Sequence, residues 1–455
     1  MAHRGLRGLT RSHGNIQLRI LYVLLTYLLL PVVLAVESWQ SLRNRSYRGR
    51  VRQRLGFIEP QPRAGAVWVH AVSVGEVQAA AALIRELQQR HPSLDIVVTT
   101  ATPTGAARVA GLFKDSVRHC YLPYDVPGAV RRFLDRIQPR VAVILETEIW
   151  PTLYRTLGRR GIPIVVASAR VTEESVDRYR RMASLFRETL SRGVLIGAQT
   201  EADAGRFRRV GAPADRVRVI GNIKYDLQVA QAAIAAGREF RQRCGTARPA
   251  WIAGSTHEGE EEAVLDAHAK LRAKHGAALL IVVPRHPQRF DAVRALLRKR
   301  GVPFAQRSAG ALPEAAHQVF LVDTIGELQS FYAAADVAFV GGSLVPIGGH
   351  SLLEPAVLGL PMLSGPHTEN APDVAEVLSR SGALQIVHDS DDLARRVSGY
   401  FDDAARARDD GERGLQAMAL GRGAVGRVVA MIEPLLSPPA SAAAPATSSA
   451  ASGSR

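Results

Sequence analysis

The side chains best suited to chemistry follow short apolar segments of this sequence. Glu76 follows the segment 66–73 at the expected start of a helix, where it could take a proton from a substrate as a general base. The same position suits a residue that caps the first helical turn, because the helix dipole stabilises a negative charge there. Spacing alone does not separate these two roles.

A second pair of acids, Glu146 and Glu148, ends the apolar segment 141–148. Two acids that are two residues apart on a strand face the same side, and each needs a partner if it is buried. Glycosidases also use paired carboxylates, although theirs come from separate elements on either side of the substrate. Solvent exposure at the end of the strand is the alternative interpretation.

Two motifs in the second half of the chain suit an anion. Pro284-Arg285-His286-Pro287 places a guanidinium after an apolar strand, where it could hold a phosphate with two hydrogen bonds. Asp323-Thr324-Ile325-Gly326-Glu327 ends another strand and opens a helix, whose free N–H groups favour a negative charge. Both motifs therefore suit an anionic group such as a phosphate.

A glycine-rich loop leads to a third such motif. Gly341, Gly342, Gly348 and Gly349 precede the segment 350–354, and glycine lets the backbone approach a ligand closely. The expected helix start after this loop would add N–H donors. The spacing Ser351-x-x-Glu354 is also a capping box, which needs no ligand.

Several common catalytic and metal-binding motifs are absent from the sequence. The chain contains no GxGxxG, GxxxxGK[ST] or HExxH motif, which argues against a dinucleotide-binding enzyme, a P-loop enzyme and a zincin. Its two cysteines, Cys120 and Cys244, are far apart and have no CxxC or Cys/His spacing. A structural zinc site and an oxidised extracellular scaffold are therefore not expected.

The net charge of +16 is concentrated near the N-terminus. Residues 1–54 contain ten Arg and a single acidic residue, Glu37, so the other 401 residues are only mildly basic. Aromatic residues make up 6% of the chain, which argues against a surface that stacks single-stranded nucleic acid. We expect no nucleic-acid partner, because the charge flanks an apolar segment instead.

That apolar segment runs from Ile20 to Val36, seventeen residues without a charge. About 17 residues is the lower limit for a helix that crosses a bilayer, and the run is long for a signal peptide and lacks an A-x-A cleavage site. The arginines after it would hold the following chain at the cytoplasmic face of the membrane. We expect a membrane-anchor helix, either spanning the bilayer or lying in its interface; a buried first helix is the alternative.

The remaining chain of this 455-residue sequence alternates strand-like and helix-like stretches. Continuous apolar strands separated by helices indicate parallel strands that are buried on both faces. The expected strands form two sets, which lie within 66–73, 95–100, 141–148, 162–169 and 193–200, and within 249–256, 278–286, 318–325, 336–343 and 360–367. The pattern predicts an α/β protein with two doubly wound, Rossmann-like domains that face a cleft.

These observations divide the chain into five parts. We predict a basic N-terminal segment with its anchor helix, a first Rossmann-like domain, a linker helix, a second Rossmann-like domain and a disordered tail rich in Pro, Ala and Ser, at residues 1–54 (helix 20–36), 55–226, 227–247, 248–436 and 437–455.

Taken together, the motifs resemble those of the 3-deoxy-D-manno-octulosonic acid (Kdo) transferase family. The resemblance extends from the apolar segment to about residue 435, and its motifs occur in order: HAVSVGE (70–76), TTATPTG (99–105), YLPYD (121–125), ETEIWP (146–151), GNIKYD (221–226), STHEGEE (255–261), PRHP (284–287), VDTIGEL (322–328), FVGGSL (339–344), GGHSLLEPA (348–356) and GPHT (365–368). Each motif is weak alone, whereas the ordered set is highly specific.

The resemblance implies a glycosyltransferase of GT-B fold, in which the first domain binds the acceptor and the second binds the nucleotide sugar. Such an enzyme transfers Kdo from CMP-Kdo to a lipid A precursor, lipid IVA, in lipopolysaccharide core biosynthesis. The transfer inverts the anomeric carbon, needs no bound metal or cofactor, and takes place at the cytoplasmic face of the inner membrane. A basic, membrane-tied surface suits an acceptor that is a phosphorylated lipid.

The resemblance also implies roles for individual residues. Glu76 matches the proton acceptor, and Glu146 and Lys224 match residues that stabilise the transition state. The residues that match CMP-contacting positions are Pro284, Arg285, Ile325, Gly326, Glu327, Ser351, Leu352, Leu353 and Glu354. Ser351 stands where the family usually has Asn; both residues cap helices well, although serine has the shorter side chain.

Two other classes of protein remain as alternatives. A GT-B glycosyltransferase with a different nucleotide-sugar donor would share the glycine loop and Glu354, but would not be expected to match HAVSVGE and PRHP together. A non-enzymatic basic membrane protein would explain residues 1–54 but not the acids at the strand ends.

Overall fold

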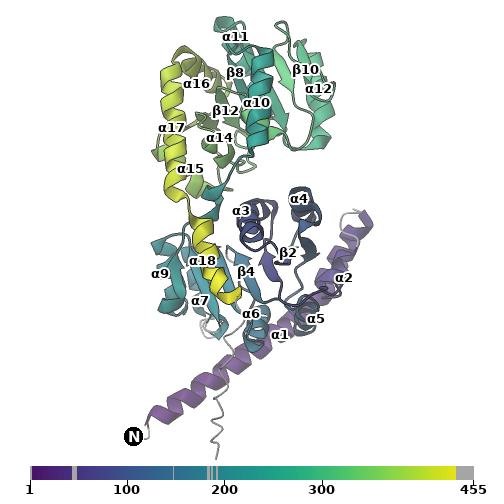
Figure 1. Ribbon diagram of the computed structural model, residues 1–455, viewed down its shortest axis with the longest axis vertical. Helices are drawn as coiled ribbons and strands as arrows, with labels where there is room; N and C mark the ends of the chain where they lie inside the picture. The colour runs from purple at the N-terminus through teal and green to yellow at the C-terminus, as the bar shows by residue number, and fades with distance from the viewer. Residues whose placement is uncertain are drawn as a thin grey trace, which may run out of the picture. The chain divides into compact units, whose positions relative to one another are not determined.

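Two α/β units make up the protein (Figure 1). The computed structural model describes residues 3–43, 49–146, 148–181, 185, 188–190 and 193–436. The first unit comprises residues up to Ile223 and those from Gly423 onward, and the second unit comprises Lys224–Arg422. Thr147 and the tail predicted at 437–455 lie outside the described residues.

The first unit is built around a seven-stranded sheet whose strand pairs are all parallel. In spatial order its strands are β3 (Arg118–Tyr121), β2 (Ile96–Thr100), β1 (Val67–His70), β4 (Val141–Leu145), β5 (Ile164–Ala169), β6 (Val194–Ala198) and β7 (Val217–Val219). The chain builds outward from β1 to β3, then returns to the other side of β1 and builds outward again from β4 to β7. The strand order therefore reverses between β1 and β4, which is where doubly wound sheets bind ligands.

Helices cover both faces of this sheet, because alternate residues of each strand point to opposite sides. Val67 and Val69 of β1 lie in one apolar cluster, and Trp68 between them lies in the other. In the part of the first unit that the structure describes, the α-helices include α1 (His3–Arg43), α2 (Arg50–Arg54), α3 (Val74–Arg90), α4 (Pro103–Phe113), α5 (Pro127–Ile137), α6 (Pro151–Arg159), α7 (Glu173–Arg181), α9 (Glu201–Arg209) and α18 (Ala424–Leu436).

The second unit repeats the same plan. Its seven parallel strands are, in spatial order, β10 (Phe304–Gln306), β11 (Val319–Leu321), β9 (Leu279–Pro284), β8 (Ala250–Thr256), β12 (Val337–Val340), β13 (Met362–Ser364) and β14 (Leu384–Ile386). The order reverses between β8 and β12. Two parallel sheets of this kind confirm the predicted fold class, whereas the predicted cleft between the domains stays a prediction.

The helices of the second unit are also those of a doubly wound fold. They are α10 (Gln231–Cys244), α11 (Glu260–Lys274), α12 (Phe290–Lys299), α13 (Leu328–Tyr332), α14 (Leu353–Val357), α15 (Pro372–Arg380), α16 (Ser390–Asp402) and α17 (Ala404–Gly421). Short 3-10 turns in the described chain occupy Lys114–Ser116, Ala214–Arg216, Ile223–Asp226 and Pro287–Arg289.

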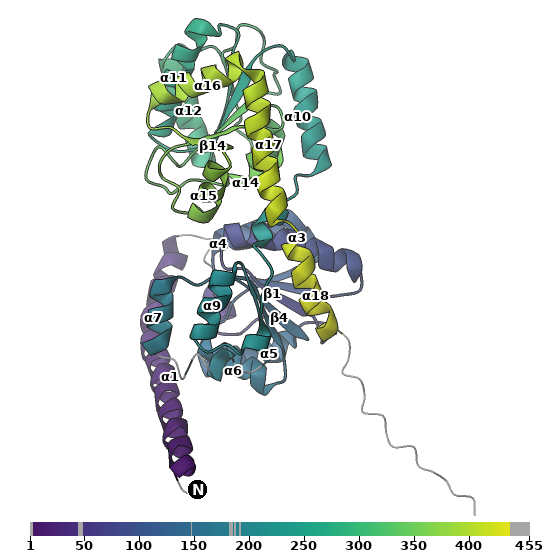
Figure 2. The ribbon, with the colours of Figure 1, turned by 90° about the vertical axis from the view of Figure 1, so that its left-hand side faces the viewer.

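The last helix, α18, belongs to the first unit, which differs from the predicted second domain of 248–436 (Figure 2). Val428, Val429 and Ile432 are fully buried in the same cluster as Val67 and Val143 of the first sheet. An apolar helical face does not reveal from sequence which sheet it will cover. The chain therefore passes between the units twice, after Ile223 and after Arg422.

The helix predicted as a separate linker at 227–247 is α10, and it packs within the second unit. Phe240 contacts Phe320 and Phe331, with ring centroids 4.9 and 5.2 Å apart, and Arg241 pairs with Asp336 at 2.8 Å. α10 therefore contributes to the core of the second unit.

Helix α1 is longer than the predicted apolar helix 20–36. It is continuous over 41 residues and contains Pro31, so neither that proline nor the flanking arginines end it. Two helical stretches in the described chain are long and apolar enough to cross a membrane, Gln17–Arg43 and Ala404–Leu436. Of the most apolar part of Gln17–Arg43, 6% is buried. The corresponding share in Ala404–Leu436, which includes α18, is 44%.

Candidate active site

Glu76 lies in the first turn of α3, directly after β1. Its carboxylate oxygen Oε2 accepts the backbone N–H of Val72 at 2.7 Å, and Ser73 Oγ accepts the N–H of Glu76 at 3.5 Å. Glu76 therefore has the capping role that its position suits, and its half-buried carboxylate is held at the carboxyl end of β1.

Glu146 lies directly after β4, in an unusual backbone conformation. Its φ angle is +57°, in the left-handed region that a residue with a side chain rarely adopts, and its N–H donates to Ala167 O at 3.0 Å. A residue held in this region costs about 1–3 kcal/mol and often marks a functional site. Burial and the nearby charge of Glu146 raise the pKa of Glu148 above its ordinary value.

The sheet topology brings Glu76 and Glu146 together at the carboxyl ends of two central strands. Strands β1 and β4 are neighbours, with His70 opposite Ile144, so the residues that follow them leave the sheet side by side. The strand order of the first sheet reverses between these two strands. The two carboxylates predicted from sequence are thus placed where a doubly wound domain binds its ligand.

A polar network that the sequence did not reveal anchors the chain just before Lys224. Ser168, at the end of β5, accepts the N–H of Ile223 at 3.2 Å and donates to Asn222 Oδ1 at 3.4 Å. Gln199 links both, because its amide donates to Ser168 O at 3.0 Å and accepts from Asn222 at 3.2 Å. Lys224 is the next residue after this anchor and the first residue of the second unit.

In the second unit, the fully buried carboxylate of Glu260 organises the glycine-rich loop. It accepts four backbone N–H groups, those of His257 at 3.0 Å, Gly342 at 2.6 Å, and Ser343 and Leu344 at 2.8 Å each. These donors follow β8 and β12, the two strands at the reversal point. The motif STHEGEE contains Glu260, but its donors 82 to 84 residues away are visible only in the structure.

Three histidines gather beside this loop. His257 and His350 lie with their Nε2 atoms 2.7 Å apart and their rings 9° from parallel, and His286 packs edge-on against His257. Gly342, with φ +70°, makes room for them, since a Cβ there would lie 2.9 Å from His350. Burial and the positive charge of Arg285 lower the pKa of His350 to about 3, and they also lower the pKa values of His257 and His286.

The predicted CMP-contacting residues follow several strands of the second sheet. Pro284 ends β9, and the exposed Arg285 after it donates its N–H to Thr256 O at 3.0 Å, which ties it to the end of β8. Ile325 is 79% exposed and precedes Gly326, whose φ is +89°. Glu327 forms an ion pair with Arg307 at 2.7 Å, and the hydrogen bonds that Arg307 donates in this pair lower the pKa of Glu327.

The segment from Ser351 to Glu354 differs from the capping box allowed by its spacing. Helix α14 begins at Leu353, and its N-cap is Leu352, without a side-chain cap. Leu352 and Leu353 are buried in the core, which fixes the start of the helix, so only their backbone can face a ligand. The exposed Ser351 lies outside the helix, and Glu354 accepts from Gln329 at 2.9 Å.

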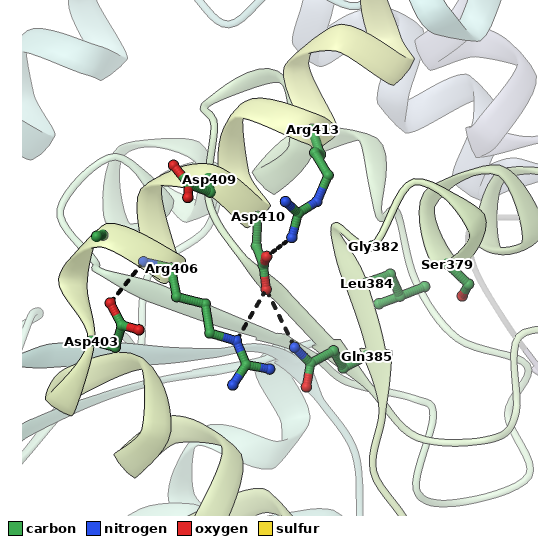
Figure 3. Close-up of a pocket in the computed structure, with 10 residues that line it drawn as sticks. Ser379, Gly382, Leu384, Gln385, Asp403, Arg406, Asp409, Asp410 and Arg413 are labelled. Carbon is green, nitrogen blue, oxygen red and sulfur yellow. Dashed lines mark hydrogen bonds and ion pairs between the residues drawn. The ribbon is translucent and has the colours of Figure 1, made fainter.

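A surface hollow of the second unit is a different feature (Figure 3). It is about 570 Å³ in volume and lies by β14 and α17, at the amino end of β14. At its centre the buried Asp410 accepts from Tyr400 at 2.7 Å and pairs with Arg406 and Arg413, so its charges are already matched. None of the predicted site residues lines this hollow.

Among the residues that the structure describes, no group of three or more His, Cys, Asp or Glu side chains is arranged to hold a metal ion. The expectation of a reaction without metal or cofactor stays a prediction.

Comparison with known proteins decides the family. The family model for 3-Deoxy-D-manno-octulosonic-acid transferase (kdotransferase) matches residues 49–227. A 3-deoxy-D-manno-octulosonic acid transferase of Haemophilus influenzae is 39% identical over 423 residues, which cover 92% of this chain and 99% of that protein. The chain belongs to the Kdo transferase family. As a member of the Kdo transferase family, it is a glycosyltransferase.

Two solved structures are similar to this Kdo transferase family member, one over less than half of the chain and one over most of it. The C-terminal CMP-Kdo binding domain of WaaA from Acinetobacter baumannii is 31% identical, with a TM-score of 0.40, and the match covers 42% of this chain and 99% of that one. A UDP-GlcNAc 2-epimerase from Neisseria meningitidis is 15% identical, with a TM-score of 0.52, over 80% of this chain and all of that one. The epimerase shares the fold, in agreement with the two parallel sheets.

Proposed function

We propose that this Kdo transferase moves Kdo from CMP-Kdo to a lipid A precursor, lipid IVA, with inversion at the anomeric carbon. The observation that carries the proposal is the position of Glu76 and Glu146, which follow the two strands at the reversal point of the first sheet. A sugar hydroxyl bound at the carboxyl ends of these two strands would lie near both carboxylates.

In this reaction Glu76 is the proton acceptor. Its carboxylate takes the proton of the acceptor hydroxyl, whose oxygen forms a bond to the anomeric carbon of Kdo, while the bond from that carbon to the CMP phosphate breaks and CMP leaves with the electron pair. The hydrogen bond from Val72 supports this role, because it holds the carboxylate in one place before the substrate arrives, and Ser73 caps the backbone N–H of Glu76.

Glu146 and Lys224 stabilise the charges that develop as the bond breaks. A carboxylate opposes the positive charge on the ketose, and an ammonium opposes the negative charge on the departing phosphate. The left-handed backbone of Glu146 and the Ser168–Ile223 hydrogen bond before Lys224 support fixed positions for both groups.

The second unit binds CMP-Kdo at the carboxyl ends of its strands. Arg285 and the neighbouring His257, His286 and His350 suit the phosphate, because burial and the positive charge of Arg285 lower the histidine pKa values, and a bound anion would offset that charge. The backbone of Ile325, Gly326, Glu327, Leu352 and Leu353, together with Pro284, Ser351 and Glu354, completes the predicted CMP site. Glu354 suits the ribose hydroxyls.

The reaction takes place at the cytoplasmic face of the inner membrane, where the lipid acceptor resides. The apolar helix α1 and the basic residues of segment 1–54 support contact with an anionic membrane surface.

Equilibrium binding of free nucleotides tests the donor. We expect CMP to bind at least tenfold more tightly than UDP, with UMP and AMP as further controls. Equal or tighter binding of UDP would favour the alternative, a GT-B enzyme with another nucleotide-sugar donor.

A further inference from the structure

Helix α1 contacts the first unit along one narrow face. Between residues 18 and 41 its half-buried or buried positions recur every three or four residues, at Leu18, Arg19, Tyr22, Val23, Thr26, Leu30, Leu34, Glu37, Gln40 and Ser41. This is the spacing of one side of an α-helix. Figures 1 and 2 both show α1 as one straight element of the first unit.

Polar contacts fix both ends of this face. Tyr22 donates to Asp125 Oδ2 at 2.8 Å, and the buried Asp125 also accepts the N–H groups of Thr152 and Leu153 at the start of α6. Glu37 is buried and pairs with Arg54 at 2.9 Å and Arg50 at 3.3 Å. Tyr22 and Glu37 are 15 residues apart, about 22 Å along the helix axis.

The other sides of α1 present large apolar side chains to the exterior. These are Ile20, Leu21, Leu24, Leu25, Tyr27, Leu28, Leu29, Val32, Val33, Val36, Trp39 and Leu42, each at least 38% exposed. Trp39 lies under the guanidinium of Arg43, 3.9 Å from its ring centroid. Arginines at positions 4, 7, 11 and 19 precede the apolar stretch.

A helix that spanned the bilayer would conflict with these contacts. The hydrocarbon core is about 30 Å thick, so a spanning α1 would draw Asp125, the Glu37 pairs and the start of α6 into lipid. Detachment of α1 would instead remove the Tyr22 hydroxyl from the buried Asp125 and the Glu37 carboxylate from Arg50 and Arg54. A helix that makes polar contacts with the protein on one side and is broadly apolar on its other sides suits the plane of a membrane surface.

We propose that α1 lies in a single leaflet, parallel to the membrane surface, with its exposed apolar side in the lipid and its Tyr22–Glu37 face on the first unit. The occupant of that apolar side is the acyl region of an anionic bilayer, because the flanking arginines complement its headgroups. The inference rests on the membrane location in the proposed function, and it specifies how the chain meets the lipid. Both ends of α1 then remain on the side of the membrane that carries the two α/β units.

Depth measurements on single-cysteine variants test this arrangement. In a Cys120→Ala, Cys244→Ser background of the full chain, Leu21→Cys, Leu28→Cys and Val36→Cys carry an NBD fluorophore in vesicles of phosphatidylethanolamine and phosphatidylglycerol. Nitroxide lipids quench at a shallow or a deep acyl carbon. Thr26→Cys, on the protein-facing side, is the matched control.

We expect the three exposed positions to share one quenching depth, within experimental error, and Thr26→Cys to be quenched several-fold less. A spanning helix would place Leu28 and Thr26 together near the bilayer centre and Leu21 and Val36 at different, shallower depths, and that profile would overturn the inference. Failure of the full chain to float with vesicles would overturn the membrane location as well, which separates the two claims.

Labelling in intact cells gives a second, independent measurement. Gly5→Cys in the same background is treated with a membrane-impermeant maleimide, before and after lysis of spheroplasts. We expect labelling only after lysis, since both ends of α1 lie on the inner side. Labelling of intact spheroplasts would show that α1 crosses the membrane.

Discussion

The N–H of Gly342 donates a 2.6 Å hydrogen bond to the buried carboxylate of Glu260, which ties the loop after β12 to the first turn of α11. With its three other N–H donors, Glu260 joins the ends of the two strands at the reversal point of the second sheet. The glycine loop is therefore held in its conformation by one side chain that need not touch the ligand.

Glu260→Gln should loosen this loop. An amide NH₂ cannot accept, so at least one N–H would lose its partner, and we expect the free energy of unfolding to fall by about 1–3 kcal/mol. The KM for the CMP-sugar should rise with little change in kcat. Glu262→Gln, an exposed residue of the same helix, is the control. Identical unfolding curves and KM values for the two variants would contradict this role.

Ser168→Ala should impair catalysis through the segment before Lys224. The change removes the acceptor for the N–H of Ile223 and the contact with Asn222. We expect kcat to fall about fivefold, the equivalent of about 1 kcal/mol, with the KM for CMP-Kdo nearly unchanged. Steady-state kinetics measure this, with Ser175→Ala on α7 as the control. An unaltered kcat would show that this hydrogen bond does not position Lys224.

Glu76→Gln should abolish transfer and leave the donor site intact. The amide cannot accept the proton of the attacking hydroxyl, so we expect kcat to fall by about 10²–10⁴-fold, with CMP affinity within twofold of the unmodified chain. Glu86→Gln, on the same helix α3, is the control. Activity of Glu76→Gln within a few-fold of the control would refute Glu76 as the base.

Acid should destabilise the protein through its buried histidines. His268 accepts from Trp251 Nε1 at 3.1 Å and donates to Gln318 O at 3.0 Å, and burial lowers its pKa to about 3. Below its unfolded pKa of about 6.5 the unfolded chain binds a proton that the folded chain does not, so stability present above pH 6.5 is lost as the pH falls toward 3.

The loss from His268 between pH 7 and pH 5 should be about 2 kcal/mol. His268→Gln keeps an acceptor and a donor but does not titrate. Between pH 7 and pH 5 the free energy of urea unfolding of this variant should therefore fall by about 2 kcal/mol less than that of the unmodified chain. The same pH slope in both proteins would show that His268 is not held neutral.

Sequence reasoning located the inner strands but not the edges of the sheets. The four strands it missed, β3, β7, β10 and β14, are the four edge strands, and each has only three or four residues. Edge strands are covered on fewer sides, so they lack the continuous apolar run that marks a buried parallel strand. The placement of Glu76 and Glu146 at strand ends followed correctly from the inner strands.

Other features depend on contacts between distant parts of the chain. The assignment of α18 to the first unit depends on Val67 and Val143, more than 280 residues earlier in the sequence. The four donors to Glu260 and the pairing of His257 with His350 likewise come from loops of different strands. At Ser351 the local capping pattern was overridden because Leu352 and Leu353 are buried in the core.

The most direct test of the proposed function is a mass spectrum of tetraacylated lipid A precursor after incubation with the detergent-solubilised protein and freshly generated CMP-Kdo. We predict a product heavier by one or more Kdo units, which would establish the donor, the acceptor and the reaction together and would count the transfers. An unchanged acceptor mass, with a control transferase active in the same mixture, would contradict the proposed donor–acceptor pair.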